Sequence, residues 1–162
     1  MTRVAETGET QVHPVAARLA AWDSAAISGT ETYRGELTVT IPREQLSRVA
    51  SFLRNDPELE FDFLSDLTAT DHVPLEPRFA VVYHMLSIRH RHTLRLRTWT
   101  AGANPSVASV TNIWPTANWH EREVFDLFGI RFEGHPDLTR LLLPLDWEGH
   151  PLRKDYPTGG YR

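Results

Sequence analysis

The sequence predicts an α+β domain with a mostly antiparallel sheet of about four strands, flanking helices and a long irregular C-terminal tail. Three observations lead to this prediction. Apolar residues first follow the order strand, helix, strand, strand, strand, and helical periods come after them. The helical stretches each have one apolar face. Over residues 132–162, glycine and proline recur without any period, which is typical of an extended segment that covers its own domain or a neighbour.

The composition is that of an ordinary soluble globular protein and excludes several functions. The 162 residues are 41% hydrophobic and 23% charged, which favours one domain. A net charge of −4 argues against nucleic acid or an anionic membrane as the main partner. The absence of cysteine excludes disulfides, and it excludes a thiolate-ligated iron–sulfur cluster or cysteine-based zinc site held by this chain alone. Without a signal peptide or an apolar run near ~20 residues, we expect a cytosolic protein, or one bound to a membrane only through another protein.

The N-terminal part predicts one strand and one helix after a polar tail. Residues 1–32 are expected to be loose, apart from a possible short helix at Val15–Trp22. Alternating apolar and polar residues predict the first strand at Tyr33–Ile41. Apolar residues at helical spacing then predict a helix between Pro42 and Asp56.

The middle of the chain supplies the rest of the sheet. We expect strands at Phe61–Thr70, Phe79–Ile88 and Thr93–Thr100. The second of these is apolar on both sides, which predicts an interior strand covered on both faces. Helical spacing over 107–114 predicts another helix, which Pro115 ends.

The stretch NWHEREVFDLFGI at 118–130 combines dense charge with dense apolar bulk. Asn118 is a good N-cap, and Glu121 three residues later completes a capping-box pattern. Gly129 stands where a helix often ends. We therefore predict a helix at Trp119–Phe128, here called the signature helix.

The polar arc of the signature helix is predicted to be an interaction face. It carries Trp119, Arg122, Glu123 and Asp126, and a surface of tryptophan, arginine and acids is typical of an interface. Arg122 and Asp126 are one turn apart and are expected to pair. Glu121 instead falls within the apolar arc. Its carboxylate must therefore cap the helix, pair with a cation or have a raised pKa.

Residues 33–131 thus form the predicted α+β domain ending in the signature helix, and residues 132–162 form a predicted docking tail. Within WEGHPLRKDYP at 147–157, aromatic residues flank the charged run 153–155. A run of charge is usually solvated surface. Aromatic residues and arginine in an extended segment favour pairing across an interface.

A free-standing metal-dependent hydrolase is the alternative from another class. It would use His120, Glu121, Glu123 and His135. His120-Glu121 begins like the helix of a zinc protease, but valine occupies position 124, where the second histidine belongs. The ordinary interpretation is that the histidines of the two Gly-His-Pro motifs, His135 and His150, bind backbone carbonyls. No glycine-rich phosphate loop or nucleophile motif is present, so direct binding of NADH or ATP is not expected.

Several motifs together resemble one known family. They are ERE at 121–123, DLFGI at 126–130, Phe132, GHP at 134–136, Arg140 and DWEGHPLRKDYP at 146–157. Their order and spacing are similar to those of the 30 kDa subunit of the proton-pumping NADH:quinone oxidoreductase (respiratory complex I). This is the C subunit of the bacterial enzyme, and chloroplast and cyanobacterial relatives call it the J subunit. The close resemblance covers residues 106–157.

The resemblance implies a non-catalytic structural subunit of a translocase. Such subunits sit in the hydrophilic arm against the large hydrogenase-like quinone-site subunit and cluster-bearing subunits, on the cytoplasmic side of the cell membrane, and touch the membrane only through the complex. No nucleic-acid partner is expected. The chain itself is expected to bind no cofactor, whereas the complex carries FMN and iron–sulfur clusters and uses NADH and quinone. The equivalent subunit of a membrane-bound nickel–iron hydrogenase, or of a ferredoxin- or deazaflavin-dependent dehydrogenase, is the alternative within this resemblance.

The resemblance also implies which residues meet the partners. The predicted interface residues are Trp119, Glu121, Arg122, Glu123, Asp126, His135, Arg140, Trp147, His150, Arg153, Lys154, Asp155 and Tyr156. One departure stands beside them. Thr139 occupies the position where the family usually has a second basic residue next to Arg140, so one ion pair is expected to be missing.

Overall fold

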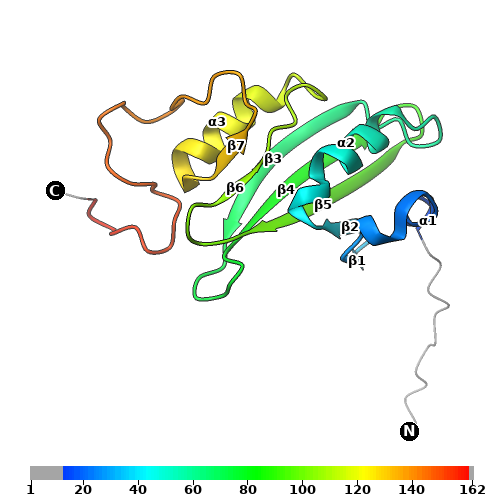
Figure 1. The fold of residues 1–162 in the computed structure, drawn as a ribbon, viewed down its shortest axis with the longest axis horizontal. Coiled ribbons are helices and arrows are strands. Elements are labelled where there is room, and N and C mark those ends of the chain that lie inside the picture. Colours follow the sequence, from blue (N-terminus) through cyan, green and yellow to red (C-terminus); the bar gives the residue numbers. More distant parts are fainter. Residues whose placement is uncertain (1–12, 161–162) are drawn as a thin grey trace, which may run out of the picture.

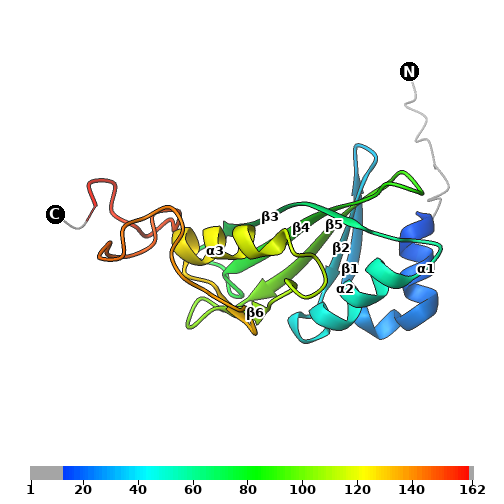
Figure 2. The same ribbon diagram turned by 90° about the horizontal axis from the view of Figure 1, so that it is seen from above.

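The computed structural model describes residues 13–160 as one five-stranded sheet with its helices on one face and an irregular segment at one end (Figures 1 and 2). The strands are β1 (Gly29–Tyr33), β2 (Glu36–Ile41), β3 (Phe63–Asp71), β4 (Phe79–Ser87) and β5 (His92–Thr100). They lie in the order β1-β2-β5-β4-β3, and all neighbours are antiparallel except β2 and β5. The predicted α+β fold with a mostly antiparallel sheet is confirmed, with five strands instead of four.

Three helices and a small second sheet complete the described part. The helices are α1 (Pro14–Asp23), α2 (Leu46–Asn55) and α3 (Ala117–Phe128), with 3₁₀ turns at Ser24–Ala26 and Arg43–Gln45. β6 (Ser106–Ala108) and β7 (Arg131–Glu133) pair in parallel. After β7 the chain has neither helix nor strand up to residue 160, as predicted for the tail. We call residues 134–160 the C-terminal segment. None of the helices in residues 13–160 is long and apolar enough to cross a bilayer.

A single apolar core lies between the helices and one face of the sheet. Leu19 of α1, Leu53 of α2 and Val124 of α3 all belong to it and are buried. Trp114 is also buried, and its indole Nε1 donates a hydrogen bond to the carbonyl oxygen of Phe61 at 2.9 Å. β4 is an interior strand, as predicted, and its residues are buried on both faces, for example Tyr83 on one and Val82 on the other. The helices themselves lie on only one face of the sheet in both views.

The N-terminal part differs from its prediction. The strand predicted at Tyr33–Ile41 is a hairpin, because Arg34 and Gly35 both adopt positive φ (50° and 84°) and reverse the chain between β1 and β2. Positive φ at both central residues is what a two-residue type I′ hairpin turn requires. The short helix predicted at Val15–Trp22 is confirmed as α1. After this helix, residues 24–32 carry a 3₁₀ turn and most of β1 where a loose tail was expected, and residues 1–12 of that tail lie outside the described residues.

The helix predicted over 107–114 is wrong. Val107 is a buried residue of the strand β6, paired with Phe132 of β7. The chain then turns, and the backbone N–H groups of Ile113 and Trp114 both donate to the carbonyl oxygen of Val110. A short strand followed by a turn buries residues three or four apart, as a helix does, so periodicity over eight residues could not separate the two.

Candidate partner-docking segment

The signature helix α3 is held at its C-terminal end by the geometry that the sequence predicts. Gly129 has φ 70°, and its N–H donates to the carbonyl oxygen of Phe125. A side chain at this position would also collide with His150 and Arg153, so glycine lets the C-terminal segment lie directly against the end of α3. The predicted capping box is wrong: Thr116 occupies the N-cap without a side-chain hydrogen bond, and Glu121 points elsewhere.

Glu121 is fully buried and joins α3 to the chain after β6. Its Oε1 accepts a hydrogen bond from the backbone N–H of Val110 and its Oε2 accepts one from the Ser109 hydroxyl, each at 2.7 Å. Burial raises the pKa of Glu121 to about 7, although both hydrogen bonds favour the carboxylate. Of the three possibilities that the sequence left open for this carboxylate, the raised pKa is confirmed. The hydroxyl of Tyr83, a neighbouring buried group, has no hydrogen-bond partner within residues 13–160.

Asp126 is also fully buried and organises the first part of the C-terminal segment. Its Oδ1 accepts from Arg140 Nη1 at 2.7 Å, and its Oδ2 accepts from the backbone N–H groups of residues 141, 142 and 143 at 3.1, 2.8 and 2.9 Å. Burial acts to raise the pKa of Asp126, but these four donors outweigh it and hold the pKa below its ordinary value. The pair predicted between Arg122 and Asp126 is therefore wrong, since Arg140 takes that place.

The side chain of Arg122 also contacts the C-terminal segment, where it binds backbone carbonyl oxygens. Its guanidinium donates to the carbonyl oxygens of Thr139 and Arg140, each at 3.1 Å, and lies 5.2 Å from the ring centre of Trp119. These bonds do not depend on the side chain at position 139. Trp119 itself is 60% exposed.

The last turn of α3 supplies a second attachment. Its free carbonyl oxygens would otherwise lack partners, as at any helix end. The carbonyl oxygen of Asp126 lies 2.8 Å from Nδ1 of His150, that of Leu127 accepts from the N–H of Leu152 at 3.0 Å, and that of Phe128 accepts from Arg153 Nε at 2.6 Å. Burial lowers the pKa of His150.

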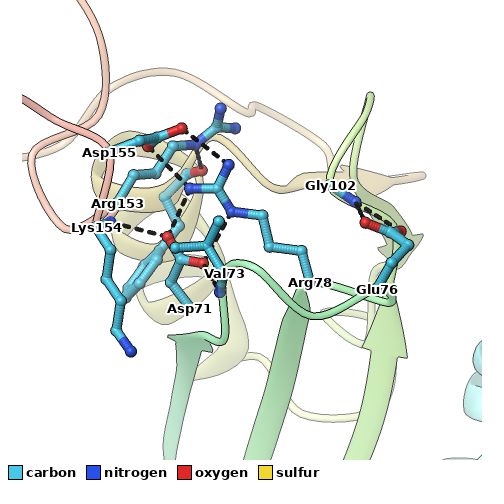
Figure 3. Close-up of polar contacts among 9 residues, drawn as sticks. Asp71, Val73, Glu76, Arg78, Gly102, Arg153, Lys154 and Asp155 are labelled. Carbon is cyan, nitrogen blue, oxygen red and sulfur yellow. Dashed lines mark hydrogen bonds and ion pairs between the residues drawn. The ribbon is translucent and has the colours of Figure 1, made fainter.

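A third attachment joins the C-terminal segment to the loop between β3 and β4 (Figure 3). Arg78 donates to Asp71 at 2.6 Å and, with its two terminal nitrogens, to both carboxylate oxygens of Asp155 at 2.8 and 2.9 Å. Asp71 also accepts from the backbone N–H of Lys154 at 2.8 Å. The Arg78 guanidinium holds the pKa of the buried Asp71 far below its ordinary value. Residues 153–155 are thus fixed by the end of α3, through Arg153, and by Asp71 and Arg78, through Lys154 and Asp155.

Comparison with known proteins decides the family. Residues 39–162 match the family described as the 30 kDa subunit of respiratory-chain NADH dehydrogenase. The chain belongs to this family. The NADH-quinone oxidoreductase C subunit of Roseiflexus castenholzii is 53% identical over 145 residues, which cover 90% of this chain and 83% of the relative. The C 2 subunit of the same enzyme from Rhizobium meliloti is 44% identical over 156 residues, covering 96% and 84%.

Solved structures agree with the membership. A trypsin-resistant fragment of Nqo5 is 35% identical, with a TM-score of 0.58, over 68% of this chain and 89% of the fragment. A chain of the membrane-bound sulfane sulfur reductase, an archaeal respiratory membrane complex, gives a TM-score of 0.75 at 22% identity, covering 89% of this chain and 84% of its own. At that identity the second likeness shows the fold alone.

For this member of the 30 kDa subunit family, the structure sorts the predicted interface residues into two groups. Those whose side chains bond within the subunit are Glu121, Arg122, Asp126, His135, Arg140, His150, Arg153 and Asp155. Those with exposed side chains include Trp119, Glu123, Trp147 and Lys154, while Tyr156 is partly buried. Contact of either group with a partner stays a prediction.

Sequence reasoning missed two exposed leucines in the C-terminal segment. Leu142 is 60% exposed and Leu145 is 86% exposed. The sequence carried a signal for them, since the run LLLPL at 141–145 lies in a segment without strand or helix period and so has no element to bury it. Exposed apolar residues that gather together mark interaction sites in soluble proteins.

The residues of the hydrolase alternative are not brought together. These are His120, Glu121, Glu123 and His135. His120 lies 3.6 Å from Asp66, His135 lies 3.2 Å from the carbonyl oxygen of Asn118, Glu121 is enclosed and Glu123 is exposed. No group of three or more histidine, aspartate or glutamate side chains in the described part of the chain is placed to hold a metal ion. The ordinary interpretation of His135 and His150, that their rings form hydrogen bonds with backbone carbonyl oxygens, is confirmed.

Replacing Asp71 by alanine is expected to detach residues 153–155 while leaving the core folded. The substitution removes the acceptor of the Lys154 N–H and leaves Arg78 with only the exposed Asp155. Limited trypsin digestion should therefore cut after Arg153 or Lys154 at least about tenfold faster, as expected for a loss of about 1.4 kcal/mol or more in local opening. The control Asp137→Ala, at an exposed residue of the same segment, should leave the rate of trypsin cleavage unchanged. Equal cleavage rates for the two variants would contradict the attachment of residues 153–155 through Asp71.

Proposed function

We propose that this chain is a non-catalytic structural subunit of the hydrophilic arm of NADH:quinone oxidoreductase. Its relatives are named as the C subunit of that enzyme, which supports the proposal. In this role the chain holds the large quinone-site subunit and the cluster-bearing subunits in register. Electron transfer from NADH to quinone, and the proton translocation coupled to it, depend on that register.

One feature of the molecule carries the structural part of the proposal. The C-terminal segment has almost no secondary structure of its own, yet three sets of hydrogen bonds fix it to α3 and to the β3–β4 loop. Its apolar side chains Leu142 and Leu145 nevertheless remain exposed. A segment that is already ordered before it meets a partner loses less conformational entropy on binding. This arrangement supports a preformed docking surface.

The cofactors of the reaction are assigned to other subunits. A chain without cysteine cannot supply the thiolates that ligate iron–sulfur clusters, so the proposal places the clusters in neighbouring chains. It places FMN and the NADH and quinone sites there too, because the sequence has no glycine-rich phosphate loop for a nucleotide. The chain then lies on the cytoplasmic side of the membrane as a peripheral subunit. The names of the close relatives favour this complex over the related hydrogenase and over ferredoxin- or deazaflavin-dependent dehydrogenases.

Replacing Leu145 by aspartate tests the proposal in the assembled complex. The side chain is 86% exposed, so folding of the subunit should be unchanged. Burying a carboxylate in an apolar interface costs several kcal/mol, so incorporation of the tagged chain into the complex should fall at least about tenfold on a native gel. Activity per assembled complex should stay the same.

The matched control is Ile88→Asp. Ile88 is 62% exposed and follows β4 at the end of the sheet away from the C-terminal segment (Figure 1). This variant should assemble like the unmodified chain. Full assembly of the Leu145 variant together with lost activity would contradict a purely structural role.

A further inference from the structure

A cleft of about 590 Å³ opens between two limbs of the C-terminal segment. The limbs are residues 144–148 and 156–160. Two carboxylates, Asp146 and Glu148, and two aromatic rings, Trp147 and Tyr156, line the cleft, and proline, threonine and glycine supply the rest of its wall. None of the lining residues within 13–160 is basic.

The negative charge of the cleft is not neutralised within residues 13–160. Asp146 and Glu148 are exposed, and neither forms an ion pair or hydrogen bond there. The arginines of the segment have other roles. Arg140 binds Asp126 and the carbonyl oxygens of Trp147 and Gly149, and Arg153 binds the carbonyl oxygen of Phe128.

The limb that carries the two acids is nevertheless fixed in place. The bonds from Arg140 to Trp147 and Gly149, at 3.0 and 3.4 Å, tie residues 147–149 to the buried Asp126 of α3. The other limb begins directly after residues 153–155, which Arg78 and Asp71 hold. One wall of the cleft is therefore attached to α3, and the other wall follows residues that are attached to the loop between β3 and β4.

We infer that this cleft receives an arginine or lysine side chain from a neighbouring subunit of the same complex. The inference deepens the proposed function and rests on it. Carboxylates beside aromatic rings bind a cationic side chain by charge and by cation–π attraction. Leu145, which lies on the first limb, offers apolar surface next to the cleft that a small free cation would leave uncovered. Nucleic acid and anionic lipid are disfavoured as occupants because the cleft is itself acidic.

Charge reversal of both acids is the test. The double variant Asp146→Lys/Glu148→Lys should fold normally and should be retained in the detergent-purified complex at least about tenfold less than the unmodified chain. The matched control Glu133→Lys/Asp137→Lys makes the same change in net charge in neighbouring exposed residues outside the cleft. It should be retained fully. Equal retention of the two double variants would overturn the inference.

A photo-crosslinking amino acid at Thr158, inside the cleft, identifies the occupant in the intact complex. The expected product joins this chain to a peptide of another subunit that contains arginine or lysine at the crosslinked site. A crosslink to residues 161–162 of the same chain, to a peptide without a basic residue, or to no protein at all would overturn the inference. These outcomes are distinct from failure of the proposed function, in which the unmodified chain would not enter the complex at all.

Discussion

The variant Asp126→Ala is expected to lose about 3–5 kcal/mol of unfolding free energy, as is typical when one partner of a buried ion pair is removed. The carboxylate is fully buried and accepts four hydrogen bonds, one from Arg140 and three from backbone N–H groups. Without it, Arg140 loses its counter-charge and three N–H groups lose their acceptor. The C-terminal segment should separate from α3 as a consequence.

Urea unfolding of the purified chain measures this loss, with fluorescence of its five tryptophans as the signal. Glu123→Ala is the matched control, because Glu123 lies on the same helix but is exposed. Its effect should stay within about 0.5 kcal/mol, the usual range for surface substitutions. If the two variants were equally stable, Asp126 would not organise the segment as described.

The variant Glu121→Gln is expected to stabilise the protein above neutral pH. Burial raises the pKa of Glu121 from 4.5 to about 7 in the folded protein, so the folded state binds the proton more tightly than the unfolded state. Stability from this group is fully present below about pH 4.5 and is lost as pH rises through about 7. This rise in pKa corresponds to about 3 kcal/mol of unfolding free energy that is lost when Glu121 is fully ionised. Glutamine does not ionise, so it avoids this loss, and its side-chain oxygen can still accept the hydrogen bond from the N–H of Val110.

Thermal unfolding between pH 5 and pH 8 measures this pH dependence of stability. The difference in melting temperature between Glu121→Gln and the unmodified chain should grow in favour of the variant across this range. The exposed Glu123→Gln on the same helix should show a constant difference. A variant that is less stable than the unmodified chain at pH 8 would mean that the ionised carboxylate is needed, and would contradict the role of burial.

The sequence predicts the overall fold well because apolar periodicity reports burial directly. The strands β3, β4 and β5 and the helix α2 all lie within a few residues of their predicted bounds. Short elements were harder to predict. β6 has three residues, and its pairing with β7 depends on a partner strand 25 residues further along the chain, which no local pattern encodes. The hairpin at Arg34-Gly35 was missed because arginine at positive φ is uncommon.

The candidate site was predicted at the level of segments and not of contacts. Both α3 and the C-terminal segment were recognised from their motifs, but Arg122 was paired with Asp126 because residues four apart on a helix are neighbours. The actual partner, Arg140, comes from an irregular segment whose path the sequence does not reveal. The same path explains why Arg153 and Asp155, predicted to meet partners, bond within the subunit. The acids at Asp146 and Glu148 remain on the outside, a difference that only the structure reveals.

The most direct test of a structural role in NADH:quinone oxidoreductase is to purify the tagged, unmodified chain from its native host in mild detergent. Mass spectrometry then identifies the proteins that accompany it. We expect the large quinone-site subunit, cluster-bearing subunits and membrane subunits in equal amounts with the chain, together with NADH-dependent quinone reduction by the sample. Recovery of a lone soluble chain without these proteins would contradict the account.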